Sequence, residues 1–191
     1  TVGWGEAGPS RRWSAETTQS TYTSIVNYLA PVLIGRDAFD IAGAHRAMDK
    51  ELAPGLDPGQ PVAKAAIDLA LHDLVTKSLG IPLQAYFGHK SLDRVRLAFL
   101  VSAPGPEETA EVVQRGLDAG YRDFKVKVGS NLANDVRNLE VAMSLAGTEG
   151  KVWPDANQGY TLAEALRAAR AFDEMGIEVF EQPVPMNDTY G

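Results

Sequence analysis

The hydrophobic pattern of this 191-residue chain changes once, near residue 93. Before that point, apolar residues recur at the three- and four-residue spacing of helices. After it, short apolar runs alternate with amphipathic stretches, which is the pattern of strands followed by helices. The pattern therefore predicts two parts: residues 1–92, mostly helical, and residues 93–191, in which strands and helices alternate.

Three helices are predicted in the first part. Ser14 is expected to cap a helix that runs to about Leu29. An aspartate, Asp37 or Asp40, is expected to open the second. The third lies in VAKAAIDLALHDLVTKSLG, where the apolar spacing is clearest and a glycine stands at the end.

Strand–helix alternation with short connections in the second part indicates a parallel sheet. The predicted strands are residues 94–101, 121–128, 151–156 and 177–184, with helices over 106–119, 131–145 and 162–175. A closed barrel of this type needs eight strands. We therefore predict an α/β fold with an incomplete (β/α) barrel, its first four strands, and we interpret the chain as part of a larger protein.

Polar residues stand at the ends of three successive strands. Lys125 and Lys127 stand at the end of the second strand, Asp155 and Asn157 at the end of the third, and Glu181 in the fourth. Lys127, Asp155 and Glu181 succeed one another at intervals of 28 and 26 residues, close to the roughly 30 residues of one β/α unit. Equal spacing places them at one level, the C-terminal rim where such barrels carry their chemistry.

Each group alone has a simpler interpretation. The lysines could form a solvated strand face, Asp155 and Asn157 an Asx-type turn, and Glu181 a partly exposed strand end. Together they suggest a metal site beside a base, because hard divalent ions prefer oxygen ligands. Asp155 and Glu181 could supply two of six positions around Mg²⁺, and a desolvated lysine beside another cation can act as a base.

Composition excludes several classes of function. The formal net charge of −7 and the lack of a basic run argue against nucleic-acid binding. No apolar stretch is long enough to span a bilayer, so no membrane association is expected. The chain has no cysteine, which excludes disulfides and thiolate chemistry. The start of the sequence lacks the features of a signal peptide, and a cytoplasmic location is the default expectation.

The motifs KVKVG, PDANQG and FEQPV, in this order and spacing, resemble the mandelate racemase/muconate lactonizing enzyme family of the enolase superfamily. AAIDLALHDLVTKSLGIPLQAYFG is similar to the family's segment between cap and barrel, and GWGE to a strand of its capping domain. The resemblance implies that residues 1–92 are part of an α+β capping domain. Residues 93–191 would then be the N-terminal half of the barrel.

The resemblance also implies roles for the polar residues. Asp155 and Glu181 would bind Mg²⁺, with Mn²⁺ as a substitute, and Lys127 would be the base on one face of the substrate. Lys125 would favour the neutral form of that base and help to neutralise charge. Asn157 would contact the substrate. The family's third metal carboxylate and its opposite-face lysine lie on later strands, which this chain does not contain.

Two further residues are candidates for substrate binding. Trp13 lies in the loop after GWGE, and cap loops close over the substrate in the resembled family. Ser102 stands at the end of the first barrel strand. The competing interpretation of Trp13 is an aromatic that only packs within a solvated loop. That of Ser102 is a strand-end serine without a functional role.

The implied reaction removes the α-proton of a small-molecule carboxylate substrate to give an enediolate. Racemisation, epimerisation or cycloisomerisation would follow, with amino-acid derivatives or dipeptides as substrates and a homo-oligomer as the expected assembly. One alternative is a dehydratase of a hydroxy (sugar) acid with the same first step. Another is a non-catalytic scaffold whose metal site is incomplete.

Overall fold

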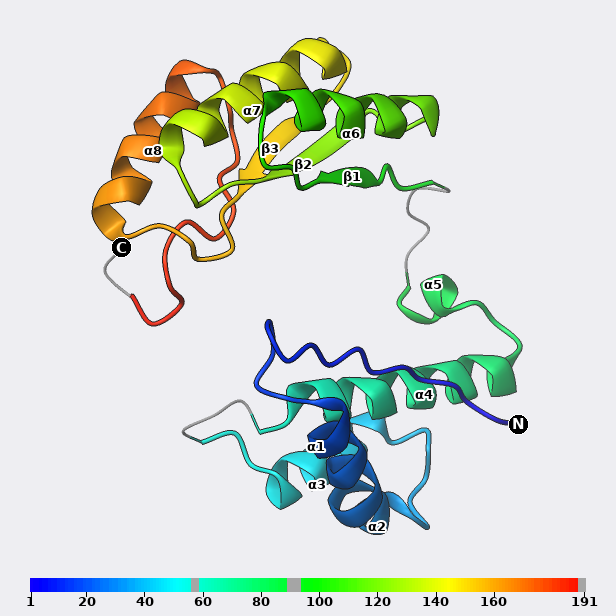
Figure 1. Ribbon diagram of the computed structural model, residues 1–191. Helices are drawn as coiled ribbons and strands as arrows, with labels where there is room; N and C mark the ends of the chain where they lie inside the picture. Colours follow the sequence, from blue (N-terminus) through cyan, green and yellow to red (C-terminus); the bar gives the residue numbers. More distant parts are fainter. Residues whose placement is uncertain (56–58, 89–93, 189–191) are drawn as a thin grey trace. The chain divides into compact units, whose positions relative to one another are not determined.

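The structure is a computed structural model that describes residues 1–55, 59–88 and 94–188. Contacts divide the chain into two compact units, Thr1–Leu92 and Asp93–Gly191, which are described separately (Figure 1). Within the described residues, no helix combines the length and the hydropathy needed to cross a membrane.

The first unit is built from helices and an extended N-terminal segment (Figure 1). Its elements are α1 (Thr18–Thr23), a π-helical stretch (Ser24–Leu29), α2 (Ala30–Leu33), α3 (Ile41–Glu51), α4 (Pro61–Leu79) and α5 (Leu83–Tyr86). Asp40 caps α3 through a hydrogen bond from the Gly43 amide, so the second of the two candidate aspartates opens that helix. Gly80 ends α4 in the left-handed conformation expected of a C-terminal glycine.

The first helix begins later than expected, and the prediction of Ser14 as its cap was wrong. Thr17 is the N-cap: its hydroxyl accepts from the Ser20 amide at 3.2 Å, and the Ser20 hydroxyl accepts from the Thr17 amide at 2.8 Å. The Ser14 hydroxyl instead donates to the Ser10 carbonyl at 3.0 Å and closes the preceding turn. A serine before a helix can either cap that helix or close the turn in front of it. Ser14 closes the turn, and the reciprocal hydrogen bonds between Thr17 and Ser20 form the cap.

The same helix continues past Leu29 to Leu33, through Pro31. A proline inside an α-helix lacks an amide donor, and its ring crowds the carbonyl four residues earlier. Here the preceding turn is π-helical, and the Ala30 amide donates to the Ile25 carbonyl five residues back. The wider turn allows the helix to pass through the proline, which the sequence pattern did not anticipate.

Two buried charged side chains fix α4 within the first unit. The Glu16 carboxylate, 1% exposed, accepts from the Val62 amide at 2.6 Å and the Ala63 amide at 3.0 Å. It therefore satisfies amides of the first turn, a role that Gln60, the N-cap residue, does not fill with its side chain. Lys64 donates to Asp49 at 2.8 Å, which ties α4 to α3.

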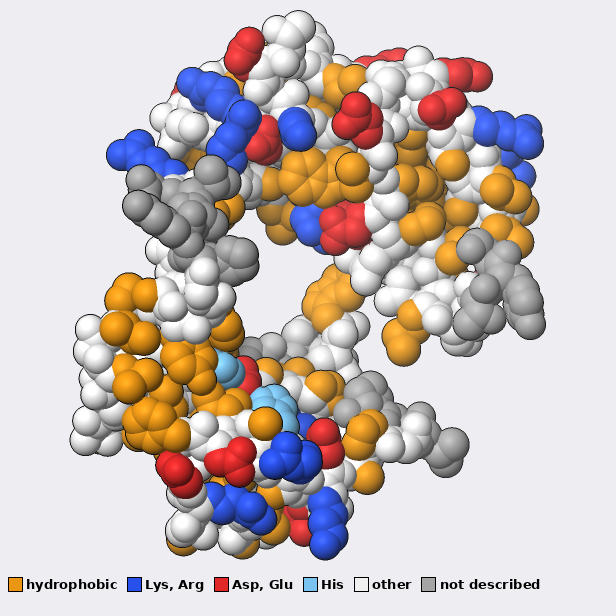
Figure 2. Space-filling view, turned by 180° about the vertical axis from the view of Figure 1, so that it is seen from behind, with side chains coloured by type: hydrophobic (Ala, Val, Ile, Leu, Met, Phe, Trp, Pro, Cys, Tyr) orange, Lys and Arg blue, Asp and Glu red, His pale blue; other side chains and the backbone are white. Residues whose placement is uncertain are grey.

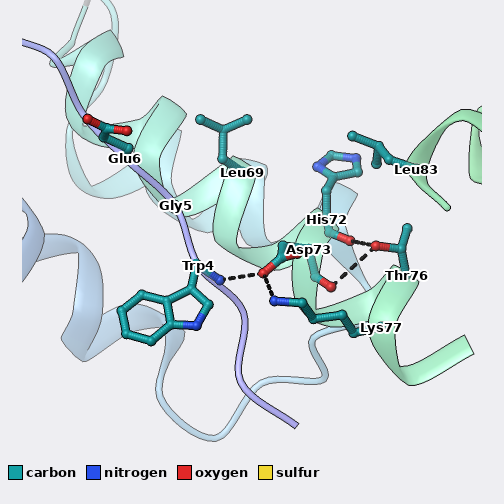
Figure 3. A pocket seen from close by; sticks show the side chains of 9 residues that line it. All are labelled: Trp4, Gly5, Glu6, Leu69, His72, Asp73, Thr76, Lys77 and Leu83. Carbon is teal, nitrogen blue, oxygen red and sulfur yellow. Dashed lines mark hydrogen bonds and ion pairs between the residues drawn. The ribbon is translucent and has the colours of Figure 1, made fainter. Parts of the chain in front are cut away.

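The N-terminal segment lies along α4, beside an open cleft of about 550 Å³ (Figure 3). A Cβ atom at Gly5 would stand 1.9 Å from the Ala66 carbonyl oxygen, so only glycine allows this close approach. The Trp4 amide donates to the Asp73 carboxylate at 2.7 Å, and Lys77 donates to the same oxygen at 2.6 Å.

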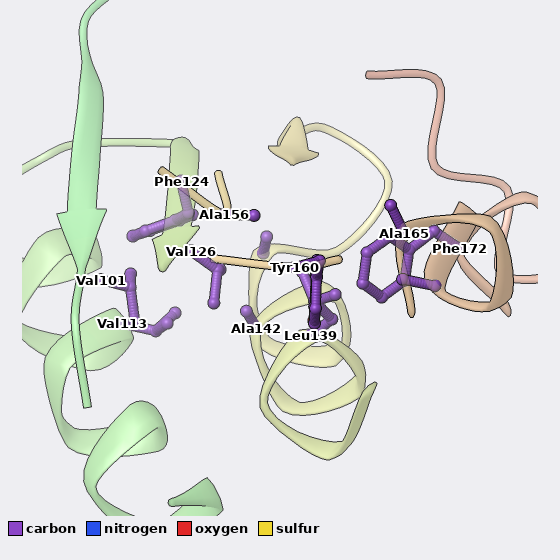
Figure 4. Close-up of a cluster of buried hydrophobic side chains, with 12 residues drawn as sticks. Val101, Val113, Phe124, Val126, Leu139, Ala142, Ala156, Tyr160, Ala165 and Phe172 are labelled. Atoms are coloured by element: carbon purple, nitrogen blue, oxygen red, sulfur yellow. The ribbon is translucent and has the colours of Figure 1, made fainter. Parts of the chain in front are cut away.

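The second unit is an α/β structure with a parallel sheet in the order β1-β2-β3 (Figure 1). Its elements are β1 (Ala98–Val101), α6 (Pro106–Asp118), β2 (Asp123–Lys127), α7 (Leu132–Ala146), β3 (Val152–Asp155) and α8 (Leu162–Glu174). Figure 1 shows α6 and α7 on one face of the sheet, where α6 contacts β1 and α7 contacts β2 and β3. The core lies between helices and sheet and includes Phe124, Val126 and Leu139 (Figure 4).

The predicted fourth strand, residues 177–184, is reduced in the described structure to one bridge between Asp155 and Glu181. The Glu181 amide donates to the Pro154 carbonyl at 2.9 Å, and the Ala156 amide donates to the Glu181 carbonyl at 3.0 Å. To extend this parallel ladder toward the strand start, the amide of residue 154 would have to donate to the carbonyl of residue 179. Proline has no such amide, so pairing begins only at Glu181.

We expect Glu16→Ala to lower the free energy of unfolding by about 1–3 kcal/mol, because it leaves buried amides at the start of α4 without an acceptor. Urea denaturation followed by far-UV circular dichroism measures the change. Glu51→Ala, at an exposed position of the same unit, is the matched control. Equal midpoints for the two variants would show that Glu16 does not stabilise α4.

Candidate active site

Strand β2 turns its apolar side chains to the helices and its two lysines to the opposite face of the sheet. Phe124 and Val126 are buried in the core, whereas the side chains of Lys125 and Lys127 are each 29% exposed. This follows from the two-residue period of a strand, since packing one face fixes the other. The lysines are thus partly desolvated rather than fully solvated.

Lys127 contacts the polar residues that end β3. It pairs with Asp155 in the sheet register. Its ammonium group donates to Asp155 Oδ2 at 2.6 Å and to Asn157 Oδ1 at 2.6 Å. Asp155 Oδ1 also accepts from the Asn157 amide at 3.0 Å, so the Asx-type turn and the lysine contact are both present.

Lys125 contacts both carboxylates. Its ammonium group donates to the two Glu181 oxygens at 3.1 and 3.2 Å and lies 3.6 Å from Asp155 Oδ2. The Asp155–Glu181 backbone bridge holds the two acidic residues next to each other. Five of the predicted site residues, Lys125, Lys127, Asp155, Asn157 and Glu181, therefore form one cluster.

The pairing shifts two pKa values in directions that keep these groups charged. The hydrogen bond to Glu181 raises the pKa of Lys125, against the opposing effect of burial. Burial acts to raise the pKa of Asp155, whose side chain is 1% exposed. The hydrogen bonds from Lys127 and the Asn157 amide, with the charges of both lysines, outweigh burial and leave the Asp155 pKa below its ordinary value.

The backbone around the cluster is unusual. Asn157, Gln158 and Gln182 adopt positive φ values of 44°, 69° and 45°, a region that non-glycine residues seldom enter. The Gln158 amide donates to the Gln182 carbonyl at 2.7 Å, which joins the two strained segments. Asn157 donates to the Gln182 side chain at 3.3 Å. With this backbone conformation, Asn157 Oδ1 accepts from the Lys127 ammonium group at 2.6 Å.

A buried carboxylate, Asp135, links the loops that follow β2 and β3. Asp135 is 2% exposed, and its Oδ2 accepts from the Gly129 amide at 3.1 Å, the Asn131 amide at 3.3 Å and the Tyr160 hydroxyl at 2.5 Å. Burial and the neighbouring carboxylate raise the pKa of Tyr160, which keeps its hydroxyl protonated as a donor. Sequence reasoning did not single out Asp135; an acidic residue in the first turn of a helix was the only signal.

The two loops touch through glycine backbones. A Cβ atom at Gly159 would lie 2.6 Å from the Gly129 carbonyl oxygen, and one at Gly129 would lie 2.8 Å from the Ala156 carbonyl oxygen. Gly129 also has a φ of 106°, which favours glycine. Larger residues would push apart the loop that follows Lys127 and the loop that carries Asn157.

The other two predicted substrate contacts remain predictions. Ser102 directly follows β1 and is exposed, at the same end of the sheet as the polar cluster. Trp13 lies in the first unit with a side chain that is 71% exposed. Large apolar side chains are exposed in both units (Figure 2), so exposure alone does not distinguish Trp13.

The cluster contains two carboxylates, and within the described residues no group of three or more His, Cys, Asp or Glu side chains gathers as a metal site. Asp155 and Glu181 present oxygen donors, which suit a hard cation. The Lys125 ammonium already lies within ion-pair distance of both. The two carboxylates are therefore already paired with positive charge, with which a bound cation would compete.

Comparison with known proteins identifies the family. Residues 1–88 match the model of the mandelate racemase / muconate lactonizing enzyme N-terminal domain, and residues 108–191 match that of the enolase C-terminal domain-like family. The chain belongs to the mandelate racemase/muconate lactonizing enzyme family. It is thus a member of the enolase superfamily.

Curated relatives carry related activities. The chain is 32% identical over 188 residues to an N-succinyl-L-Arg/Lys racemase from Bacillus cereus, covering 98% of this chain and 50% of that protein. It is 33% identical over 193 residues to an L-Ala-D/L-Glu epimerase from Bacillus subtilis, covering 100% of this chain and 51% of that protein. Chloromuconate cycloisomerases and a cis-3-hydroxy-L-proline dehydratase also match. The chain spans about half the length of the curated relatives it matches.

Solved structures of this family are similar in fold. A dipeptide epimerase from Cytophaga hutchinsonii, complexed with Mg and the dipeptide D-Ala-L-Val, matches with a TM-score of 0.86 and 29% identity, covering 97% of this chain and 49% of that one. This likeness supports the parallel α/β fold of the second unit. The Mg ion and dipeptide belong to that protein.

We expect Tyr160→Phe to destabilise the protein by about 1–3 kcal/mol, because Asp135 loses a charge-assisted hydrogen bond in a buried position. Chemical denaturation measures the loss. Tyr121→Phe, which removes the hydroxyl of a half-buried tyrosine in the same unit, is the control. If both substitutions have the same small effect, the Asp135–Tyr160 contact does not hold the loops together.

Proposed function

We propose that the protein containing this chain is a Mg²⁺-dependent isomerase that removes the α-proton of a carboxylate substrate from one face. Protonation of the same carbon on the opposite face then completes a racemisation or epimerisation. Residues 1–92 are then part of the capping domain, and residues 93–191 are the first half of a (β/α) barrel. Lys127 is the base, and Asp155 and Glu181 are metal ligands. Asn157, Ser102 and Trp13 contact the substrate.

The observation that carries the proposal is the cluster of two lysines and two carboxylates on the face of the sheet opposite the helices. Burying such charges is costly unless they are paired or functional. Aliphatic residues would pack a strand face at lower cost, so a purely structural role does not account for four ionisable groups. A partly desolvated lysine beside hard-cation ligands is the combination that α-proton abstraction from a carboxylate requires.

The donor set fits part of a Mg²⁺ site. Both carboxylates are held next to each other by the backbone, and Asp155 is deeply buried. When bound, Mg²⁺ supplies electrophilic stabilisation of the negative charge that forms on a substrate carboxylate. As the neutral amine, Lys127 would accept the proton, and Lys125 would place a positive charge beside the carboxylates. Asn157 holds the Lys127 side chain in position by its 2.6 Å contact.

Amino-acid derivatives and dipeptides are the proposed substrates. The support comes from relatives whose names specify N-succinyl-Arg/Lys and L-Ala-D/L-Glu. In both, the reacting carbon lies next to a carbonyl group, which matches the chemistry proposed for Lys127.

A dehydratase is the second candidate, favoured by a cis-3-hydroxy-L-proline dehydratase that is 35% identical over 155 residues. It shares the first step and differs in losing water afterwards. Product mass separates the two: an isomerase returns the substrate mass, with deuterium added in D₂O, whereas a dehydratase releases a product lighter by one water.

Lys127→Ala is expected to reduce α-deuterium uptake by about 10²–10⁴-fold, because the base is removed. The assay incubates L-Ala-L-Glu or N-succinyl-L-Arg with the purified protein and Mg²⁺ in D₂O and follows the α-proton by NMR. Lys151→Ala, at an exposed position of the same unit, is the control. Undiminished exchange in Lys127→Ala would remove this residue from the mechanism. No exchange by the wild type under any of these conditions would favour the non-catalytic scaffold.

Asp155→Asn should weaken Mg²⁺ binding by about 100-fold or more, since even changes behind the ligands cost 10–100-fold in affinity. Isothermal titration calorimetry with Mg²⁺ measures the change, and Asp173→Asn on the exposed surface of α8 is the charge-matched control. Unchanged Mg²⁺ affinity in Asp155→Asn would contradict the assignment of this carboxylate as a ligand.

A further inference from the structure

Trp153 lies on the same face of the sheet as the polar cluster. The register of β2 and β3 pairs Lys125 with Trp153 and Lys127 with Asp155. Because side chains alternate along a strand, Trp153 and Asp155 share one face, with Trp153 beside Lys125. Its indole Nε1 donates a hydrogen bond to Glu181 Oε2 at 3.2 Å. We propose that Trp153 is a positioning residue that fixes the Glu181 carboxylate as a metal ligand; this rests on the proposed function.

The two candidate ligands are held very differently. Asp155, whose side chain is 1% exposed, accepts from Lys127, the Asn157 amide and the Asn157 side chain at 2.6, 3.0 and 3.2 Å. Glu181 has a longer side chain that is 37% exposed. In the described structure its carboxylate is held by Lys125 and Trp153. Glu181 therefore depends on few contacts for its orientation, and each of them matters.

Of those two contacts, only the indole is compatible with a cation at the same oxygens. The Lys125 ammonium carries a positive charge on a flexible stem, so it repels a divalent ion and competes with it for the carboxylate. The indole N–H is a neutral donor on a rigid ring with two rotatable bonds. A carboxylate offers about four lone-pair directions, so a hydrogen bond to Oε2 leaves Oε1 and part of Oε2 available for the ion. Trp153 can hold Glu181 before and after metal binding.

The competing explanation is that Trp153 only fills space beside Lys125. The two explanations differ in what the N–H does. If it positions Glu181, then removing the N–H without changing the ring shape weakens Mg²⁺ binding. If Trp153 only packs, that replacement changes nothing, whereas a smaller ring affects folding.

The test therefore uses two replacements. Trp153→Phe removes the N–H and part of the ring. Replacement of Trp153 by 3-benzothienylalanine puts sulfur in place of the N–H and keeps the ring size, so we expect this variant to pack and fold as the wild type does. Trp4→Phe, in the first unit with an exposed side chain, is the control. Circular dichroism and thermal unfolding establish that each variant is folded.

Mg²⁺ alone is titrated into each protein by calorimetry. We expect the Kd for Mg²⁺ to rise about 10-fold in both Trp153 variants, the lower end of the loss seen when a group behind a ligand is removed, and to stay unchanged in Trp4→Phe. In the D₂O exchange assay, the Mg²⁺ concentration for half-maximal rate should rise by the same factor. The rate at saturating Mg²⁺ should change less than twofold, because the base is untouched.

Wild-type Mg²⁺ affinity in the benzothienyl variant overturns the positioning role, whether or not the phenylalanine variant is weakened, and leaves the proposed function standing. A loss of maximal rate without a change in Mg²⁺ affinity also overturns it. Failure of the wild type itself to bind Mg²⁺ overturns both the inference and the metal-dependent function. The wild-type measurement therefore separates failure of the function from failure of the inference.

Discussion

The arrangement of the second unit depends on pairing between two lysines and two carboxylates on one face of a parallel sheet. The opposite face packs against the helices, because Phe124 and Val126 lie in the core. The ionisable groups must therefore share the remaining face, where each depends on the others for compensation. Asp155 is the central member, since it contacts Lys127 and lies within ion-pair distance of Lys125. Its burial is tolerable only with both cations present.

The loops that complete the cluster are held by a second, separate set of contacts. Asp135 joins the loop after β2 to Tyr160 in the loop after β3, and the glycine contacts bring the same two loops together at the backbone level. The positive φ values of Asn157 and Gln182 are maintained against their intrinsic cost by these surroundings. Strand register thus places the charged groups at the same end of the sheet. The buried loop contacts hold the backbone from which their side chains project.

Much of this organisation could be predicted from the sequence, because it follows from the period of the apolar residues and from the intervals between the polar ones. The alternation of strands and helices and the common level of Lys127, Asp155 and Glu181 both follow from local rules. What failed depended on single hydrogen bonds. The cap at Thr17 rather than Ser14 was decided by a reciprocal pair with Ser20, and the helix passed Pro31 because the turn before it widened. Asp135 escaped notice because Tyr160, whose hydroxyl donates to it, is 25 residues away in the sequence.

Pro154 has a consequence for how this unit assembles. Without an amide at that position, the segment before Glu181 forms no continuous hydrogen-bonded ladder with β3. The first pairing between this segment and β3 is the Asp155–Glu181 bridge. From there, the Gln158 amide donates to the Gln182 carbonyl and the Tyr160 amide donates to the Pro183 carbonyl. The last segment is therefore joined to the sheet at the same residues that gather the charges. Asp155 and Glu181 therefore belong both to the attachment of this segment and to the charged cluster, so a substitution at either position is expected to affect both.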